Sequence, residues 1–558
     1  MVKKVLSLLH KEITGLHQAA YLLGLFALSS QVLALIRDRI LAAQFGAGNI
    51  LDLYYAAFRI PDFIFVTVAS LVSISVLIPY LIEQFQKSEE EAKEFINQIF
   101  TFFFLVIVSI SALVFILTPF LLRFIFPSFA SEDSFSDLVM LSRILLLSPI
   151  FLGFSNLLAS ITQINNRFFI YAISPILYNV GIIAGIVVLY PIMGLTGLVW
   201  GVVIGAVLHF GVQMPFVIQK KLLPTLSFPL RLDLVRKVVF NSVPRTIAVS
   251  SNEIAQLFLI SFASFLAVGS ISIFNFSFHL QSVPFSIIGV SYSLAAFPAL
   301  TRLFSSGNID KFLEQMIVSS RHIIFWSVPV SVMFVVLRAQ IVRTILGAGK
   351  FGWSDTRLTA AALALFTISL IAQNMSTLFV KSYYSRGKTK IPLIINVISA
   401  FIIVIVSYGL VYVFNNDFFF RDFMESLLKV SDIPGTVVLM LPLGFSFGVI
   451  INAVVHWIAF HLEFKEYSKP VLRTLFQISG SSTIMGFVAY KFLDVFDDIF
   501  NLETLRGIFF QGFFSGIIGI STGVIVLYLL KSTELREVWK TLHKKIWKAK
   551  IVGPDAEL

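Results

Sequence analysis

A few charged side chains inside long apolar segments are the residues best placed to do chemistry. They are Arg37, Asp52, Arg59, Arg245, Glu253 and His279. A charged side chain costs roughly 2.5–3.5 kcal/mol at the centre of a bilayer unless it faces a protein interior or a wet cavity. Guanidinium groups bind phosphate oxygens through paired hydrogen bonds, so this set predicts a cationic, partly desolvated cavity for an anion.

A simpler interpretation exists for some of these charges. Arg37 and Arg39 follow an apolar run and can reach the membrane surface from a helix end, while Arg59 can pair with Asp52 or Asp62. We assign Arg39 to this interpretation and leave Arg37 open. It fits Arg59 less well, because apolar residues flank it on both sides. Arg143 is a further arginine that falls in or at the edge of a span.

The composition is that of a membrane protein. Of 558 residues, 57% are hydrophobic and only 13% are charged, against about 25% in an average soluble chain. The absence of cysteine excludes disulfides, cysteine-based metal sites and cysteine nucleophiles. The net charge of +11 is explained by cytoplasmic loops that face anionic lipid, so we expect no nucleic-acid partner.

The apolar runs predict an all-α polytopic membrane protein with about fourteen spanning helices. They lie at 18–44, 52–82, 95–126, 137–162, 168–190, 194–218, 238–266, 271–301, 313–337, 357–380, 391–414, 436–461, 472–491 and 507–530. We expect two six-helix lobes plus a C-terminal helix pair. The corresponding domains are an amphipathic N-terminal segment (1–17), the first lobe (18–218), the start of the second lobe (238–414), an external insert (415–435), helix 12 (436–461), the final pair (472–530) and a basic tail (531–558).

Charge and proline positions add an orientation and an internal symmetry. Most of the 42 lysines and arginines fall in alternate loops and in both tails, which favours cytoplasmic N- and C-termini. Pro61 and Pro284 lie in the second and eighth spans, at matching places in the two lobes, and each predicts a kink or break. Matching interrupted helices in repeated halves are typical of transport sites near the membrane midplane.

No motif indicates an enzyme. The stretch LGAGKFG lacks the first glycine and the Ser/Thr of a phosphate-binding loop, so a tight turn is the better interpretation. No Gly-x-Ser-x-Gly or His-Glu-x-x-His occurs, and His209 is interpreted as a hydrogen-bonded packing residue. We therefore expect no catalytic residues, no metal and no organic cofactor.

The stretch RDRILAAQFGAGNILDLYYAAFRIPDF resembles the signature of the MurJ (MviN) lipid II flippases of the multidrug/oligosaccharidyl-lipid/polysaccharide exporter superfamily. SPILYNVGII, WGVVIGAVLHFGVQMP, FPALTRLFSSGNIDKF and YYSRGKTKIPL agree with it in order. The resemblance implies a bacterial inner-membrane transporter that flips undecaprenyl-diphosphate-linked peptidoglycan precursor by alternating access, with a lipid-tail groove formed by the last two helices.

The resemblance also implies roles for single residues. Arg37, Asp52 and Arg59 match family positions in the first two helices, and with His279 and Arg245 they form the expected substrate-binding set. Asp38, Asn179, Pro61 and Pro284 are expected to be structural or gating residues, and Glu253 is the candidate for a coupling monovalent cation; coupling to the membrane potential is the alternative.

The sequence departs from the family pattern at several positions. Gln31 and Phe65 stand where the family usually has arginine, His279 replaces another arginine, and Leu259 replaces an aspartate. Loss of arginines weakens anion binding, so a flippase for another polyprenyl-linked oligosaccharide, an ion-coupled drug exporter and a non-transporting membrane scaffold stay open. The expected partners are a lipid-linked anionic substrate, membrane lipids and the cell-wall synthesis machinery, with the protein itself a monomer.

Overall fold

The computed structural model describes residues 16–69, 74–129, 134–165 and 167–547, and every regular element in them is a helix. The chain divides into two compact units. Unit 1 comprises Met1–Leu280, Ile345–Ala362 and Thr389–Gly448, and unit 2 comprises Gln281–Thr344, Leu363–Lys388 and Val449–Leu558. The all-α membrane class predicted from the sequence is confirmed.

The helices follow the apolar runs closely. In chain order they are α2 (Leu16–Phe45), α3 (Asn49–Ala69), α4 (Ile74–Lys87), α5 (Glu89–Ile125), α6 (Phe135–Leu145), α7 (Leu147–Ile164), α8 (Phe168–Ala184), the π-helix η3 (Gly185–Leu189), α9 (Tyr190–Met193), α10 (Leu195–Gly211), α11 (Met214–Gln219), α12 (Leu232–Ser264), α13 (Ser270–Phe285), the π-helix η4 (Ser286–Val290) and α14 (Ser291–Ser305). They continue with α15 (Ile309–Val336), α16 (Arg338–Leu346), α17 (Trp353–Ile368), α18 (Leu370–Ser385), α19 (Lys390–Asn416), α20 (Phe418–Leu428), the 3₁₀-helix η5 (Thr436–Leu439), α21 (Met440–Glu463), α22 (Ser468–Asp497), α23 (Leu505–Leu529) and α24 (Thr533–Trp547).

Most of the predicted spans correspond to helices that are long and apolar enough to cross a membrane. Nine helices or helix runs within the described residues are long and apolar enough to cross a membrane, and the pair α17–α18, bent by 42°, makes ten if it is one span. Each of the fourteen predicted segments overlaps one of the helices or helix runs above. The count of fourteen spans stays a prediction.

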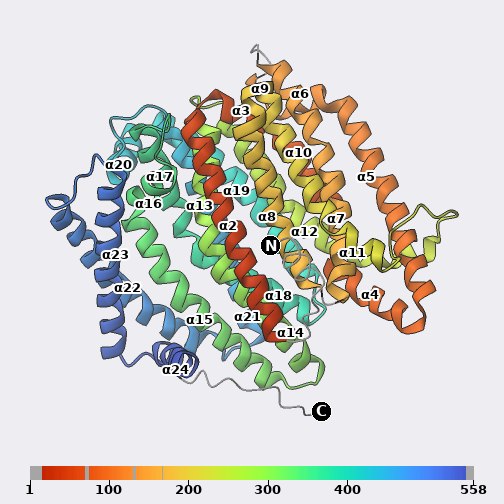
Figure 1. Ribbon diagram of the computed structural model, residues 1–558. Coiled ribbons are helices and arrows are strands. Elements are labelled where there is room, and N and C mark those ends of the chain that lie inside the picture. Colours follow the sequence, from red (N-terminus) through yellow and green to blue (C-terminus); the bar gives the residue numbers. More distant parts are fainter. Residues whose placement is uncertain (1–15, 70–73, 130–133, 166, 548–558) are drawn as a thin grey trace. The chain divides into compact units, whose positions relative to one another are not determined.

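Glycines allow α8 and α10 of unit 1 to pack backbone against backbone (Figure 1). A Cβ at Gly181 would lie 2.3 Å from the Cα of Gly205, and one at Gly185 would lie 2.5 Å from the Cα of Gly201. Small residues at matching positions are the usual means of close helix packing in membranes. This packing fixes α8, which carries Asn179, against the rest of unit 1.

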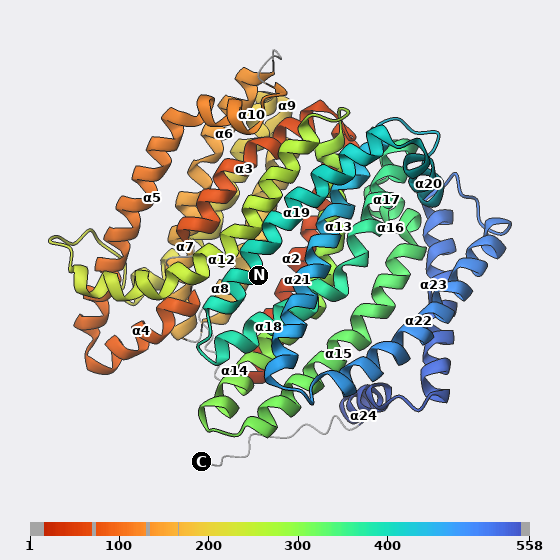
Figure 2. The ribbon, with the colours of Figure 1, turned by 180° about the vertical axis from the view of Figure 1, so that it is seen from behind.

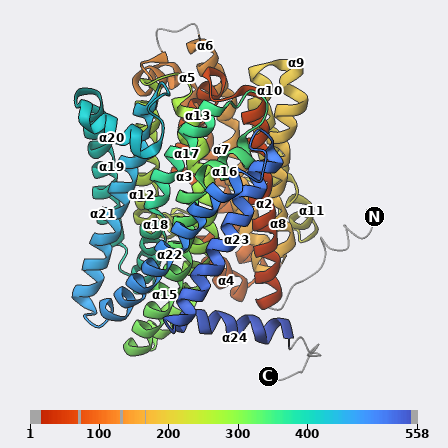
Figure 3. The ribbon, with the colours of Figure 1, turned by 90° about the vertical axis from the view of Figure 1, so that its left-hand side faces the viewer.

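Each unit contains a further pair of helices that pack along each other. In unit 1, α12 lies beside α19, and this pairing is visible from behind in Figure 2. In unit 2, α22 and α23 pack along each other, and the amphipathic helix α24 runs across their ends (Figure 3). Helix α24 falls in the predicted basic tail.

Prolines act differently in the two spans where we predicted a kink or break. Helix α3 continues as an α-helix through the buried Pro61. Pro284, by contrast, is followed within two residues by the π-helix η4, where the hydrogen-bond pattern changes. A proline removes one helical hydrogen bond, and a π-turn is one way in which a helix absorbs the change.

The remaining domain predictions are only partly visible. The segment 1–17 lies almost entirely outside the described residues. The insert 415–435 contains α20, whose Met424 and Leu428 are buried while Phe419 and Phe423 are exposed, as expected for an amphipathic surface helix. The division into two six-helix lobes stays a prediction.

Candidate functional site

A charged cluster in unit 1 joins helix α2 to α13. The guanidinium of Arg37 donates from Nε and Nη2 to Oδ1 of Asp38, at 3.0 and 2.8 Å. Nδ1 of His279 lies 3.0 Å from the other carboxylate oxygen, Oδ2. Asp38 is therefore the bridge between an arginine and a histidine that are 242 positions apart in the sequence.

The exposure of these three side chains differs in a useful way. The Asp38 side chain is only 3% exposed, whereas Arg37 and His279 are 17% and 33% exposed. Nε2 of His279 has no hydrogen-bond partner among the described residues. The buried carboxylate thus holds two nitrogen-rich groups that still have accessible surface.

Asn179 of α8 completes the surroundings of Arg37. Its side-chain oxygen accepts a hydrogen bond from Nη1 of Arg37 at 3.2 Å, and its amide donates to Ser30 Oγ and to the Pro175 carbonyl. Within its helix, Pro175 has lost its own N–H and Asn179 binds its carbonyl, so the amide orientation is fixed locally. The structural or gating role expected of Asn179 stays a prediction.

Arg59 of α3 forms a second centre with α13. Its Nη2 donates to Oδ1 of Asn275, and its buried Nε has no hydrogen-bond partner among the described residues. Asn275 also donates to the Ile271 carbonyl, which directs its oxygen toward the arginine. Asp62 and Glu253 lie near enough to act electrostatically on Arg59.

The side chain of Tyr55 lies beside these two centres. Tyr55 lies one turn before Arg59 on α3, and its ring meets that of His279 edge-to-face, with centroids 6.0 Å apart. Its hydroxyl is buried without a partner among the described residues. A buried, unpaired hydroxyl is costly, and one beside two cations is suited to donate to an incoming anion.

The carboxylate of Asp52 binds the beginning of α13, and its predicted part in substrate binding stays a prediction. Its buried carboxylate accepts hydrogen bonds from the backbone N–H of Gly269 (2.6 Å) and from the N–H and hydroxyl of Ser272 (2.8 and 2.6 Å). These groups belong to the first turn of α13 and the residue before it, where backbone donors lack helical partners and a negative charge is favourable. Asp52 therefore caps α13 from another helix.

Two glycine turns hold the ends of α2 and α13. Gly269, with φ +91°, lies so close to Ala47 that a Cβ would meet the Ala47 carbonyl oxygen at 2.4 Å. Gly349, with φ +53°, likewise has no room for a Cβ beside Ala43, and Lys350 N donates to the Ala43 carbonyl. The stretch LGAGKFG is thus a tight turn, as predicted, and it packs on the end of α2.

The other predicted residues have simpler positions. Arg39 donates from Nη1 to the carbonyl of Ile345 at 3.0 Å, and its expected position at the membrane surface stays a prediction. His209 meets Ser155 Oγ at 2.7 Å, as a hydrogen-bonded packing residue should. Helix α12 carries Arg245, but its side chain lies outside the described part of the structure.

Sequence reasoning captured part of this arrangement and missed part. It expected a cationic surplus, whereas Asp38, Asp62 and Glu253 lie beside the two arginines and offset their charge. It also overlooked Asn275. The available signal was spacing, because Asn275 precedes His279 by four residues and so shares its helix face.

The fold is that of solved transporters. A structure titled lipid II flippase MurJ, inward closed conformation, aligns with a TM-score of 0.72 at 22% identity, covering 93% of this chain and all of the other. An inward-facing multidrug resistance MATE family transporter of the MOP superfamily aligns with a TM-score of 0.62 at 14% identity, covering 79% and 96%. The likenesses define a polytopic exporter fold.

Sequence comparison narrows the class to one family. The chain belongs to the family described as lipid II flippase MurJ, whose profile matches residues 41–509. A probable lipid II flippase MurJ from Thermotoga maritima is 27% identical over 530 residues, which cover 93% of this chain and 97% of the relative. A protein of the same description from Buchnera aphidicola is 27% identical over 399 residues, 70% of this chain and 77% of the relative.

Proposed function

We propose that this protein translocates lipid II, the undecaprenyl-diphosphate-linked peptidoglycan precursor, across the bacterial inner membrane by alternating access. The observation that carries the proposal is the family match over residues 41–509. The charged cluster of α2, α3 and α13 supports it, because α2 and α3 carry the stretch that resembles the family signature. The protein acts as a transporter and not as a catalyst.

We assign binding of the substrate's diphosphate to Arg37, Arg59 and His279. Arg37 and His279 are partly exposed, and Arg59 retains an unpaired Nε. An anion that approaches these nitrogens replaces water and gains charge-assisted hydrogen bonds, which are about twice as strong as neutral ones. The polyprenyl tail stays in lipid while the sugars and peptide cross a hydrated path.

The neighbouring carboxylates weaken the binding of the diphosphate by these cationic residues. Asp38 fixes Nδ1 of His279 as the protonated nitrogen, so Nε2 is an acceptor when the ring is neutral and a donor when it is charged. A site whose arginines are already partly offset by acids binds a diphosphate reversibly, which a transporter needs in order to release it. Glu253, near Arg59, is the proposed site of coupling to a monovalent cation.

The remaining proposals concern the residues that position the site, the orientation of the termini and the oligomeric state. Asp52 and Asn179 position the cationic residues, and Pro284 with η4 supplies a place where α13 can bend. Both termini lie in the cytoplasm, as the distribution of basic residues favours. The protein works as a monomer among membrane lipids and delivers its substrate to the cell-wall synthesis machinery.

Complementation tests the proposal. A bacterium depleted of its own lipid II flippase should regain growth and shape when it expresses this chain, with membrane insertion verified by immunoblotting of the membrane fraction. If the inserted protein does not restore growth, the proposed function fails for lipid II. The arginine losses at the positions of Gln31 and Phe65 would then favour another lipid-linked oligosaccharide or a scaffold.

A further inference from the structure

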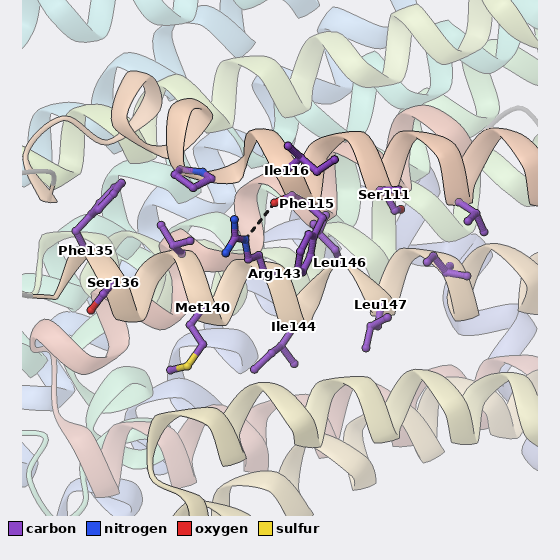
Figure 4. A pocket seen from close by; sticks show the side chains of 15 residues that line it. Ser111, Phe115, Ile116, Phe135, Ser136, Met140, Arg143, Ile144, Leu146 and Leu147 are labelled. Carbon is purple, nitrogen blue, oxygen red and sulfur yellow. Dashed lines mark hydrogen bonds between the residues drawn. The ribbon is translucent and has the colours of Figure 1, made fainter.

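A cavity of unit 1 lies away from the charged cluster, between α5 and the helices α6 and α7. It measures about 1000 Å³ and is lined almost entirely by apolar side chains, which Figure 4 shows from close by. Its lining includes Ser111, Phe115, Ile116, Phe135, Met140, Arg143 and Ile144. Arg143 is the one charged residue among the fifteen described residues that line it.

The reason for an arginine in this apolar setting begins with Pro119. A proline cannot donate to the carbonyl four residues earlier, so the carbonyl of Phe115 loses its helical partner. Nε of Arg143 takes that place at 3.1 Å, and its guanidinium rests over the Phe115 ring, 4.7 Å from the centroid. In Figure 4 the side chain points across the pocket toward Phe115.

This structural role uses only part of the guanidinium. The terminal nitrogens of Arg143 have no hydrogen-bond or carboxylate partner among the described residues. Ser111, one turn from Phe115 on α5, also lines the pocket, and its buried hydroxyl has no partner there either. An unpaired charge and an unpaired hydroxyl beside one apolar cavity are both expensive unless a polar ligand joins them.

The depth of Arg143 identifies the kind of ligand. Arg143 lies eight residues after Phe135, roughly 12 Å along the helix. The run Phe135–Ile164 is about 45 Å long, against a hydrocarbon core of about 30 Å. If the run is centred, Arg143 sits a few ångströms inside the hydrocarbon boundary. Lipid phosphates and glycerol esters lie near this level, and Ser111 would lie deeper by about 6 Å.

We propose that the pocket of α5, α6 and α7 binds an anionic phospholipid, with Arg143 holding its phosphate, Ser111 an ester carbonyl and the apolar lining an acyl chain. The site is separate from the assigned diphosphate contacts and does not rest on the proposed function. Neutral annular lipid would also fill an apolar groove, but it would leave the charge of Arg143 uncompensated.

Native mass spectrometry of the purified full-length protein tests the site, with phosphatidylglycerol and phosphatidylethanolamine of matched chains as probes. Wild type should prefer phosphatidylglycerol. Arg143→Gln should weaken phosphatidylglycerol binding by about fivefold or more. Arg143→Lys keeps the charge but not the fork of N–H donors, so it should weaken that binding less than Arg143→Gln does. The matched control is Arg236→Gln, because Arg236 also lies over a phenylalanine ring, that of Phe240, but does not line the pocket.

A second variant keeps the test decisive if loss of Arg143 prevents folding. Ala112 lines the pocket and is exposed, so Ala112→Trp should fill the cavity without changing the charge. It should lower phosphatidylglycerol binding about as much as Arg143→Gln. Equal binding of both lipids by wild type, or undiminished phosphatidylglycerol binding by the two variants, would overturn the proposal.

Discussion

Two buried ion clusters, one in each unit, use the same residue types in opposite ways. In unit 1, Asp38 joins Arg37 and His279, and both partners remain partly exposed. In unit 2, Glu534 of α24 accepts hydrogen bonds from Arg321 Nε (2.8 Å), Thr474 (2.9 Å) and Ser532 (2.7 Å). Only 2% of the Glu534 side chain is exposed.

The difference lies in what each cluster leaves unpaired. Glu534 has protein donors on both carboxylate oxygens, and it fastens α24 to α15 and α22. The unit 1 cluster leaves Nε of Arg59, the hydroxyl of Tyr55 and Nε2 of His279 without partners among the described residues. A buried charge alone is therefore weak evidence of function, and the unpaired atoms of the unit 1 cluster are what support its proposed role in binding.

Removing Arg37 and Arg59 together should reduce lipid II translocation more than any other change. Charged hydrogen bonds contribute roughly 1.5–3 kcal/mol each, so the double variant Arg37→Ala/Arg59→Ala should reduce lipid II translocation by at least about a hundredfold. The measurement is growth rescue in flippase-depleted cells and transport in proteoliposomes. Arg357→Ala removes an exposed ion pair with Asp432 in the same unit and should leave transport unchanged. Normal transport by the double variant would remove the distinction between the two clusters.

The unit 2 cluster should affect stability and not translocation. Glu534→Ala leaves Arg321 without its carboxylate, which should cost about 3 kcal/mol of stability. Thermal unfolding in detergent should show a lower Tm, while translocation per folded molecule should stay near that of wild type. A selective loss of transport at unchanged Tm would contradict the purely structural role of this cluster.

Acid titration provides a check on the same cluster. Burial alone would raise the pKa of Glu534, but hydrogen bonds from Ser532, Arg321 and Thr474 lower the pKa to about 2. Because the folded pKa lies below the unfolded value of about 4.3, this stabilisation is present above about pH 4.3 and is lost as the pH falls toward 2. Hydrogen exchange in α24 should therefore stay slow at pH 5. Release of α24 already at that pH would contradict this.

A substitution at Asp52 should lower stability and transport less than removal of either cluster. Asp52→Asn retains an acceptor for α13 but removes the negative charge, so we expect a loss of about 1–2 kcal/mol in stability. Transport should also fall, because a less firmly capped α13 no longer holds His279 in its place. The comparison of Tm with transport separates capping from substrate contact. A large transport defect without any change in Tm would return Asp52 to the substrate-binding set.

His279 should give the mildest change. His279→Gln can still donate to Oδ2 of Asp38 but lacks the imidazole, so lipid II transport should fall by only about threefold to tenfold. Transport in proteoliposomes measures this effect. Transport equal to that of wild type would remove His279 from the substrate-binding set.

The sequence predicted the helices well because twenty apolar residues leave a chain few alternatives in a membrane. It also placed Arg37 and His279 in one set of cavity-lining residues, since both are too polar to face lipid. It could not predict that Asp52 caps α13, because the N–H groups that it binds lie 217 and 220 residues away and leave no local signal. Asn275 was missed for a related reason. A neutral amide in a span is unremarkable until an arginine is placed beside it.

The most direct measurement is the binding of undecaprenyl diphosphate, which lacks the sugars and peptide, to the purified protein. The central claim is that the unfinished cluster of unit 1 recognises the diphosphate. Wild type should bind this lipid more tightly than undecaprenyl alcohol, and Arg59→Ala should lose about tenfold or more of that preference, whereas Glu534→Ala should retain it. Equal binding of both lipids by wild type, or an unchanged preference in Arg59→Ala, would contradict the claim.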